Sequence, residues 1–132
     1  MAETRLEPTY RVETERDFDE AVRRVEEETA AAGFRVLHVH DVAATLAEKG
    51  FASEPYKIVE ICNARYASRV LGEDPEVGAL LPCKVNVYRR QGRTYLSALL
   101  PSAMAAFYPG PAVAEVAREV EQAVRAIVDR AR

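Results

Sequence analysis

Two cysteines and two histidines are the side chains of this sequence that could act as soft metal ligands or as a nucleophile with its base. His38 and His40 are two residues apart in a segment that alternates like a β-strand. Both should therefore point to one face, with their Cβ atoms about 7 Å apart. A metal ion can be held at that spacing. The alternative is a partly exposed strand face, with Leu37 and Val39 directed into the core.

Cys62 and Cys83 have neither zinc-ribbon nor Cys-x-x-Cys spacing. Cys62 should end one strand and Cys83 should begin the next, so antiparallel pairing would bring both sulfurs to the same end of the sheet. Alternation opposes a shared site, because it places Cys83 with the core-like Val85 and Val87. A bulge at a strand end adds one residue and would turn the cysteine to the other face of the sheet. A dithiol or metal site and a pair of inert buried cysteines both remain open.

A polar and aromatic strand face is the third candidate for a site. Alternation places four residues on it, and the neighbouring strand adds two more: Lys84, Asn86, Tyr88 and Arg90, with Tyr56 and Glu60. Such a surface can bind a small ligand, pair with a second subunit or face water. It also permits a hydrolase or isomerase hypothesis that uses Glu60, Asn63 and Tyr88.

Hydrophobic periodicity indicates the elements that position these residues. Asp17 and Glu20 have the spacing of a helix cap and its reciprocal carboxylate, and the amphipathic helix that follows should end at Gly33. A second long helix is predicted over 113–128. The strands are expected at residues 10–13, 34–40, 56–62, 83–90 and 94–100, the last two joined as a hairpin through Gln91-Gly92-Arg93.

Shorter helical segments interrupt this plan. Asp41 can cap a helix that stops at Lys49-Gly50, and one or two helical turns after Asn63 should lead into a loop at Asp74-Pro75 and Gly78. Residues 102–106 are ambiguous. The order of elements predicts an α+β fold in two layers, a mostly antiparallel sheet with two long helices on one face and short helical insertions. We expect a single domain over residues 1–132.

Composition excludes several classes of function. The 132 residues include 18 Lys+Arg and 21 Asp+Glu, a net charge of −3 that argues against nucleic-acid binding. No stretch approaches the roughly 20 apolar residues of a membrane span, so we expect a cytoplasmic protein with no membrane partner. Phosphate-binding Gly-rich loops, Gly-x-Ser-x-Gly and His-Glu-x-x-His are absent from the sequence. The sequence names no cofactor or metal, leaves enzymatic activity undecided and favours a binding role.

A set of residues along most of the chain closely resembles the bacterial and archaeal domain-of-unknown-function family 302. It comprises Tyr56 to Asn63, Ala67, Asp74-Pro75 and Gly78 to Val85, with Gly33-Phe34, Val36, Asp41-Val42 and Leu46 upstream and Gly92 and Pro101 downstream. Members often have Asn-Pro where this chain has Asn63-Ala64. Many lack the cysteines at positions 62 and 83, so this sequence resembles a cysteine-bearing branch and thiol chemistry is not obligatory for the family.

The resemblance implies a β-α-β4-α domain of the TATA-binding-protein-like kind and a homodimer, with no established activity. Our leading hypothesis is a homodimeric, non-enzymatic binding or regulatory module for a small ligand or a protein partner. The alternative is a thiol-redox, metal-binding or sensing site built on Cys62 and Cys83, with His38 and His40 as further candidates. The candidate site residues are Cys62, Asn63, Cys83, Glu60, His38, His40, Lys84 and Asn86.

Overall fold

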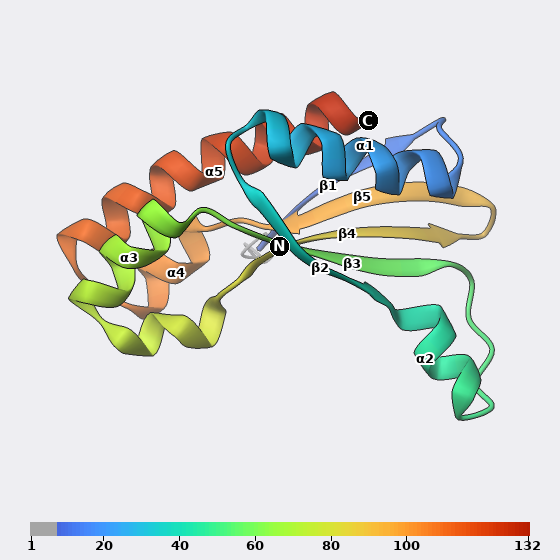
Figure 1. The fold of residues 1–132 in the computed structure, drawn as a ribbon, viewed down its shortest axis with the longest axis horizontal. Helices are drawn as coiled ribbons and strands as arrows, with labels where there is room; N and C mark the ends of the chain where they lie inside the picture. Colours follow the sequence, from blue (N-terminus) through green and yellow to red (C-terminus); the bar gives the residue numbers. More distant parts are fainter. Residues whose placement is uncertain (1–7) are drawn as a thin grey trace, which may run out of the picture.

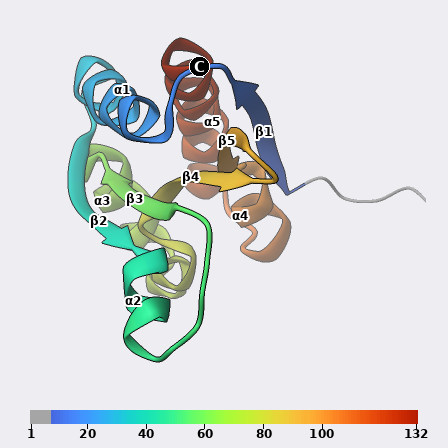
Figure 2. The same ribbon diagram turned by 90° about the vertical axis from the view of Figure 1, so that its right-hand side faces the viewer.

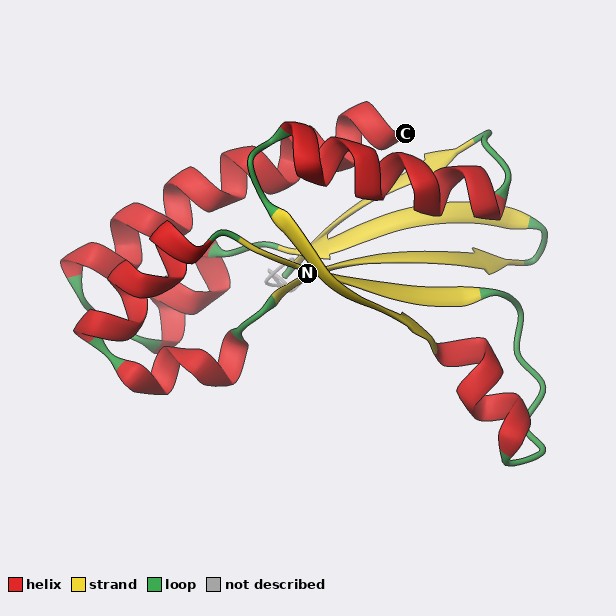
Figure 3. Cartoon of the chain, in the orientation of Figure 1, coloured by secondary structure: helices red, strands yellow, loops and turns green. Residues whose placement is uncertain are grey.

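The computed structural model describes residues 8–132, which are built around one five-stranded antiparallel sheet (Figures 1 and 3). The strands lie in the order β1-β5-β4-β3-β2. They are β1 (Thr9–Thr14), β2 (Arg35–Asp41), β3 (Tyr56–Cys62), β4 (Cys83–Arg90) and β5 (Arg93–Leu99). The predicted hairpin joins β4 to β5 through Gln91 and Gly92, at φ 53° and 79°. Positive φ at both positions is the turn geometry that matches the twist of a hairpin.

Two long helices, α1 (Phe18–Ala31) and α5 (Pro111–Ala131), lie across one face of the sheet (Figure 2). Their apolar stripes meet the inward side chains of the central strands. The fully buried core residues include Val25, Val59, Ile61, Val85, Val87, Leu96, Val113, Val124 and Ile127. This arrangement confirms the predicted α+β class with two helices on one face.

The start of α1 differs in one detail from the expected reciprocal cap. The Asp17 carboxylate accepts from the Glu20 N–H at 2.8 Å, as predicted. The Glu20 carboxylate does not return the bond; it pairs instead with Arg16 at 2.7 Å. A guanidinium within reach offers a charge-assisted hydrogen bond, which is stronger than one to a neutral backbone N–H.

Three short helices extend beyond one end of the sheet (Figure 1). They are α3 (Ala64–Glu73), the 3₁₀ helix η1 (Pro75–Leu80) and α4 (Ser102–Phe107). The first and the last pack against α5, and the middle one packs against the first. The loop expected at Asp74-Pro75 and Gly78 is therefore wrong. The Asp74 side chain accepts from the Glu76 N–H at 3.0 Å, and a capping side chain followed by Pro75 starts a helix.

Helix α2 (Val42–Glu48) projects from the other end of the sheet (Figures 1 and 2). Asp41 caps it as predicted and accepts from the Ala44 N–H at 2.9 Å. None of its residues is buried. Within residues 8–132, α1 and α5 cover one side of the sheet and no helix covers the other, which we call the open face. None of the described helices is long and apolar enough to cross a membrane.

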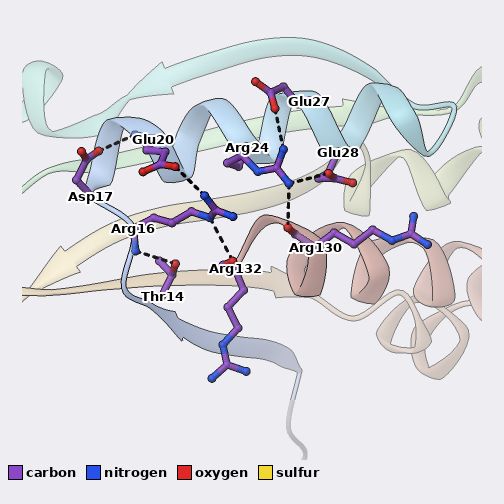
Figure 4. Close-up of polar contacts among 9 residues, drawn as sticks. All are labelled: Thr14, Arg16, Asp17, Glu20, Arg24, Glu27, Glu28, Arg130 and Arg132. Atoms are coloured by element: carbon purple, nitrogen blue, oxygen red, sulfur yellow. Dashed lines mark hydrogen bonds and ion pairs between the residues drawn. The ribbon is translucent and has the colours of Figure 1, made fainter.

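Arginine side chains join the end of α5 to α1 and the segment before it (Figure 4). Arg24 donates to the Arg130 carbonyl at 3.3 Å, and Arg16 donates to the Arg132 carbonyl at 3.2 Å. The same Arg24 guanidinium pairs with Glu27 and Glu28 on its own helix. The last carbonyls of α5 lack partners within that helix, so these arginines satisfy groups that would otherwise depend on water.

Candidate functional site on the open face

A row of three stacked tyrosines crosses the open face near the β4–β5 turn. The strand register places Tyr56 opposite Tyr88 and Tyr88 opposite Tyr95. The ring centroids are 5.3 Å apart in both pairs, at interplanar angles of 13° and 28°. Tyr88 therefore has a ring on each side and presents its edge and hydroxyl. Burial raises the pKa of Tyr56, and neighbouring Tyr88 raises it further.

The next row of the open face carries Arg11, Ser97 and Asn86. The register places Arg11 opposite Ser97 and Ser97 opposite Asn86. Ser97 is buried even though this face has no helix over it. The guanidinium carbon of Arg11 lies 4.9 Å from the centroid of Tyr95. Its polar contact with Tyr88 is the main cause that raises the pKa of Arg11. The tyrosine row thus positions a cation that is otherwise exposed.

Both rows except Tyr95, together with residues 53–54 and 89–91, line a groove of about 690 Å³, which we call the open-face groove. Its lining residues are Arg11, Ser53, Glu54, Tyr56, Asn86, Tyr88, Arg89, Arg90, Gln91 and Ser97. Three guanidinium groups and one carboxylate are among them. That carboxylate, Glu54, already accepts from the Gln91 N–H at 2.9 Å. The groove can hold a small molecule, since ligand pockets commonly have volumes of about 300–1,000 Å³.

The predicted residues His38, His40, Glu60 and Lys84 lie on the same open face. His38 is opposite Glu60, and Glu60 is opposite Lys84. His40 Nε2 lies 2.6 Å from Glu60 Oε1, and the two imidazole centroids are 4.4 Å apart, so the histidines share a face as their spacing predicts. None of these four residues lines the open-face groove.

The expectation that Leu37 points into the core is wrong. The register of β2 with β3 shifts between Val36 and His38, so Leu37 is the extra residue of a bulge. Its side chain is 49% exposed. Val39, beyond the bulge, packs against the core as expected.

Asn86 and Asn63, both candidate site residues, have different surroundings. Asn86 lines the open-face groove. Asn63 caps α3, where its Oδ1 accepts from the Arg65 and Tyr66 N–H groups and its Nδ2 donates to the Gly33 carbonyl. Its amide is therefore used in the fold. The structure does not bring Glu60, Asn63 and Tyr88 together as a hydrolase site would require.

Cys62 and Cys83 lie at the same end of the sheet and line one cavity, although the strand register assigns them to opposite faces. Cys83 is opposite Ile61, whose side chain is in the core, while Cys62 is opposite Arg35. Both thiols are free, and both line a cavity of about 20 Å³, room for about one water molecule. Burial is the main cause that raises the pKa of Cys83 to about 11, with a smaller contribution from Cys62.

The raised pKa of Cys83 affects its chemistry directly. A thiol with that pKa is protonated at neutral pH and is a poor nucleophile and a poor metal ligand. In residues 8–132, no group of three or more His, Cys, Asp or Glu side chains is placed to hold a metal ion. The cysteines and histidines therefore do not form a recognisable metal centre in the described chain.

Sequence reasoning missed Arg11 and Ser97 as residues of the candidate site. Alternation does place Arg11 on the other face of its strand from Tyr10 and Val12, which indicates an outward-facing side chain. Nothing in that pattern identifies β5 as the partner of β1. Ser97 lies in a segment of mostly apolar residues, so it gives no local signal of a polar groove.

The comparisons with known proteins place the chain in a family. The family profile described as "Domain of unknown function DUF302" matches residues 10–131. The crystal structure of an uncharacterized conserved DUF302 protein from Bacillus stearothermophilus has a TM-score of 0.89 and 36% sequence identity to this chain. The similarity covers 95% of this chain and 98% of that one. No functionally curated protein matches. This protein belongs to the DUF302 family.

Proposed function

We propose that this protein is a non-enzymatic, homodimeric binding module that holds a small ligand on the open face of its sheet. The open-face groove is the observation that carries this proposal. Its volume of about 690 Å³ suits a small molecule. Tyr56 and Tyr88 give it a stacked aromatic wall, and Asn86 and Ser97 give it hydrogen-bonding groups. A fixed apolar wall beside a few polar groups is the usual composition of a ligand pocket.

The homodimer is supported by α2 and the segment that follows it. Most residues of α2 are apolar and none is buried. Phe51 is 63% exposed, and its N–H donates to the Leu46 carbonyl at 3.0 Å, which fixes the backbone there. Apolar surface that projects from a domain commonly marks a protein–protein interface. A second copy that covers α2 and Phe51 would remove this surface from water.

The thiol and metal alternative has less support than ligand binding. Burial raises the pKa of Cys83 to about 11, so it holds even less thiolate at neutral pH than an ordinary thiol does. Cys62 and Cys83 are free, and the cavity that both line has room for only about one water molecule. The His40–Glu60 pair is one ordinary polar contact on an exposed face.

Native mass spectrometry of the untreated protein tests this function. We expect a dimer that carries a non-covalently bound small molecule. Tyr88→Ala should lose that molecule, while Phe107→Ala, a control at an exposed phenylalanine outside the groove, should retain it. A monomer would contradict the homodimer. A bound molecule that persists in Tyr88→Ala would contradict the open-face groove as the binding site.

A further inference from the structure

We propose that the open-face groove binds a small organic anion, with its carboxylate or phosphate group on Arg11. This inference rests on the binding function proposed above and specifies its ligand class. Three kinds of observation support it: the local charge, the placement of the Arg11 guanidinium, and the aromatic wall beside it.

The charge of the groove is opposite in sign to that of the whole chain. Arg11, Arg89 and Arg90 line it with Glu54 as the single carboxylate, whereas the full sequence has a net charge of −3. In residues 8–132, none of these three arginines is in an ion pair, although eight ion pairs occur elsewhere. A concave surface with excess positive charge raises the local concentration of anions.

The placement of Arg11 suits an oxyanion that presents two adjacent oxygens. Its guanidinium lies over the Tyr95 ring at 4.9 Å and contacts Tyr88, so its position is restricted. A guanidinium has five N–H donors in a fixed fork, which matches two oxygens of a carboxylate or phosphate. Ser97 and Asn86 continue the same row across the sheet. Their hydroxyl and amide groups are placed to hydrogen-bond a polar substituent beside the anionic group.

The aromatic wall indicates that the ligand has an organic part as well as an anionic group. Tyr56 and Tyr88 stack at 5.3 Å, and their edges form the side of the groove next to Asn86. A bare inorganic ion would leave these ring edges in water and most of the 690 Å³ empty. An attached hydrocarbon or aromatic group would bury part of that apolar surface, which favours binding.

The test is a titration followed by ¹⁵N–¹H NMR on the full chain. The probes are phenyl phosphate and benzoate, with benzyl alcohol as the neutral analogue and inorganic phosphate as the bare ion. We expect saturable shifts with both organic anions at the amides of Arg11, Tyr88 and Ser97. Arg11→Gln should lower the affinity for both organic anions by about tenfold or more, because it removes charge-assisted hydrogen bonds. Arg11→Lys should be intermediate, since it keeps the charge and loses the fork.

The control is Arg118→Gln, which removes an exposed arginine of α5 outside the groove and should leave affinity unchanged. Equal affinity in the Arg11 and Arg118 variants would overturn the assignment of Arg11. Benzyl alcohol binding as tightly as benzoate would overturn the requirement for an anion and leave a binding module. If inorganic phosphate binds as tightly as phenyl phosphate, the inference that the ligand carries an organic group is overturned. If no probe binds and the groove amides shift on dilution, the groove is a protomer interface, and the ligand function fails together with this inference.

Discussion

At the scale of single residues, burial controls the reactivity of Cys83. Its pKa is raised to about 11, chiefly because the thiolate would lose its hydration. At pH 8 a thiol with that pKa is ionised in about one molecule per thousand. We expect iodoacetamide to modify Cys83 slowly in the folded protein and rapidly in urea, as measured by peptide mass spectrometry. Rapid modification of the folded protein would contradict the burial of this thiol.

The same shift predicts how stability changes at alkaline pH. The folded-state pKa of Cys83, about 11, exceeds the ordinary value of 9.0. The contribution of the protonated thiol to the free energy of unfolding is therefore complete below pH 9 and is lost as the pH rises through about 11. Two pKa units correspond to about 2–3 kcal/mol. Urea unfolding at several pH values should show a shallower alkaline decline for Cys83→Ala than for the wild type. Cys62→Ala is the matched control, and equal slopes for Cys83→Ala and wild type would rule out this linkage.

The sequence predicts residue directions well where strands are regular. His38 and His40 share a face because alternation holds over that interval. Leu37 could not be placed, because the bulge that exposes it depends on how β2 pairs with β3. No residue type in that segment marks a bulge, unlike the glycines that mark turns.

At the scale of elements, the start of α5 depends on a carboxylate from another helix. Glu73 of α3 accepts from the Ala112 and Val113 N–H groups at 3.2 and 2.7 Å, and Gly110 offers no side chain for the task. We expect Glu73→Ala to lower the free energy of unfolding by about 1 kcal/mol, because the cap and its charge at the helix N-terminus are lost. Urea denaturation measures the change.

Glu76→Ala is the control for that cap, since Glu76 is an exposed carboxylate with no side-chain hydrogen bond to α5 in residues 8–132. Equal losses in the two variants would contradict the capping role.

The same packing predicts that Gly110→Ala is poorly tolerated. A Cβ there would lie 2.7 Å from the Glu73 carboxylate carbon, and Gly110 has φ 158°.

The other end of α5 depends on Arg24. Its guanidinium donates to the Arg130 carbonyl and pairs with Glu27 and Glu28, so it links α1 to the last turn of α5 (Figure 4). Arg24→Met keeps most of the apolar stem and removes the donors. We expect it to cost about 1 kcal/mol in urea unfolding. Arg23→Met, at the exposed neighbouring position, should change stability by less; a larger loss in that control would contradict the link.

The long elements could be predicted from the sequence, whereas the short ones could not. Helices α1 and α5 repeat their apolar pattern over several turns, and the β4–β5 hairpin has a glycine between two alternating segments. The Asp74-Pro75 signal occurs in loops and at helix starts alike. In the structure, η1 forms there and packs against α3, a contact that the local sequence does not reveal.

At the scale of the whole molecule, the open-face groove is formed by register between strands. Each tyrosine of the row is on a different strand, and alternation within a strand shows only which face it occupies. The polar face of β4 was therefore predictable, but the stacking of Tyr56, Tyr88 and Tyr95 was not. Arg11 joins the groove because β1 pairs with β5, a contact between the start of the described chain and its last strand.

The proposed homodimer makes a prediction at this same scale. Two phenylalanines are strongly exposed: Phe51 at 63%, after α2, and Phe107 at 70%, at the end of α4. Helices α2 and α4 lie at opposite ends of the molecule (Figure 1). If α2 and Phe51 form the interface, Phe51→Asp places a charge where a second copy would bury it, and the dimer should dissociate at micromolar concentration.

Sedimentation velocity on the wild type and both variants distinguishes the two ends. Phe107→Asp introduces the same charge at an equally exposed phenylalanine and should remain dimeric. Circular dichroism should show both variants folded, because neither side chain is in the core. Dissociation of Phe107→Asp alone would place the interface on α4.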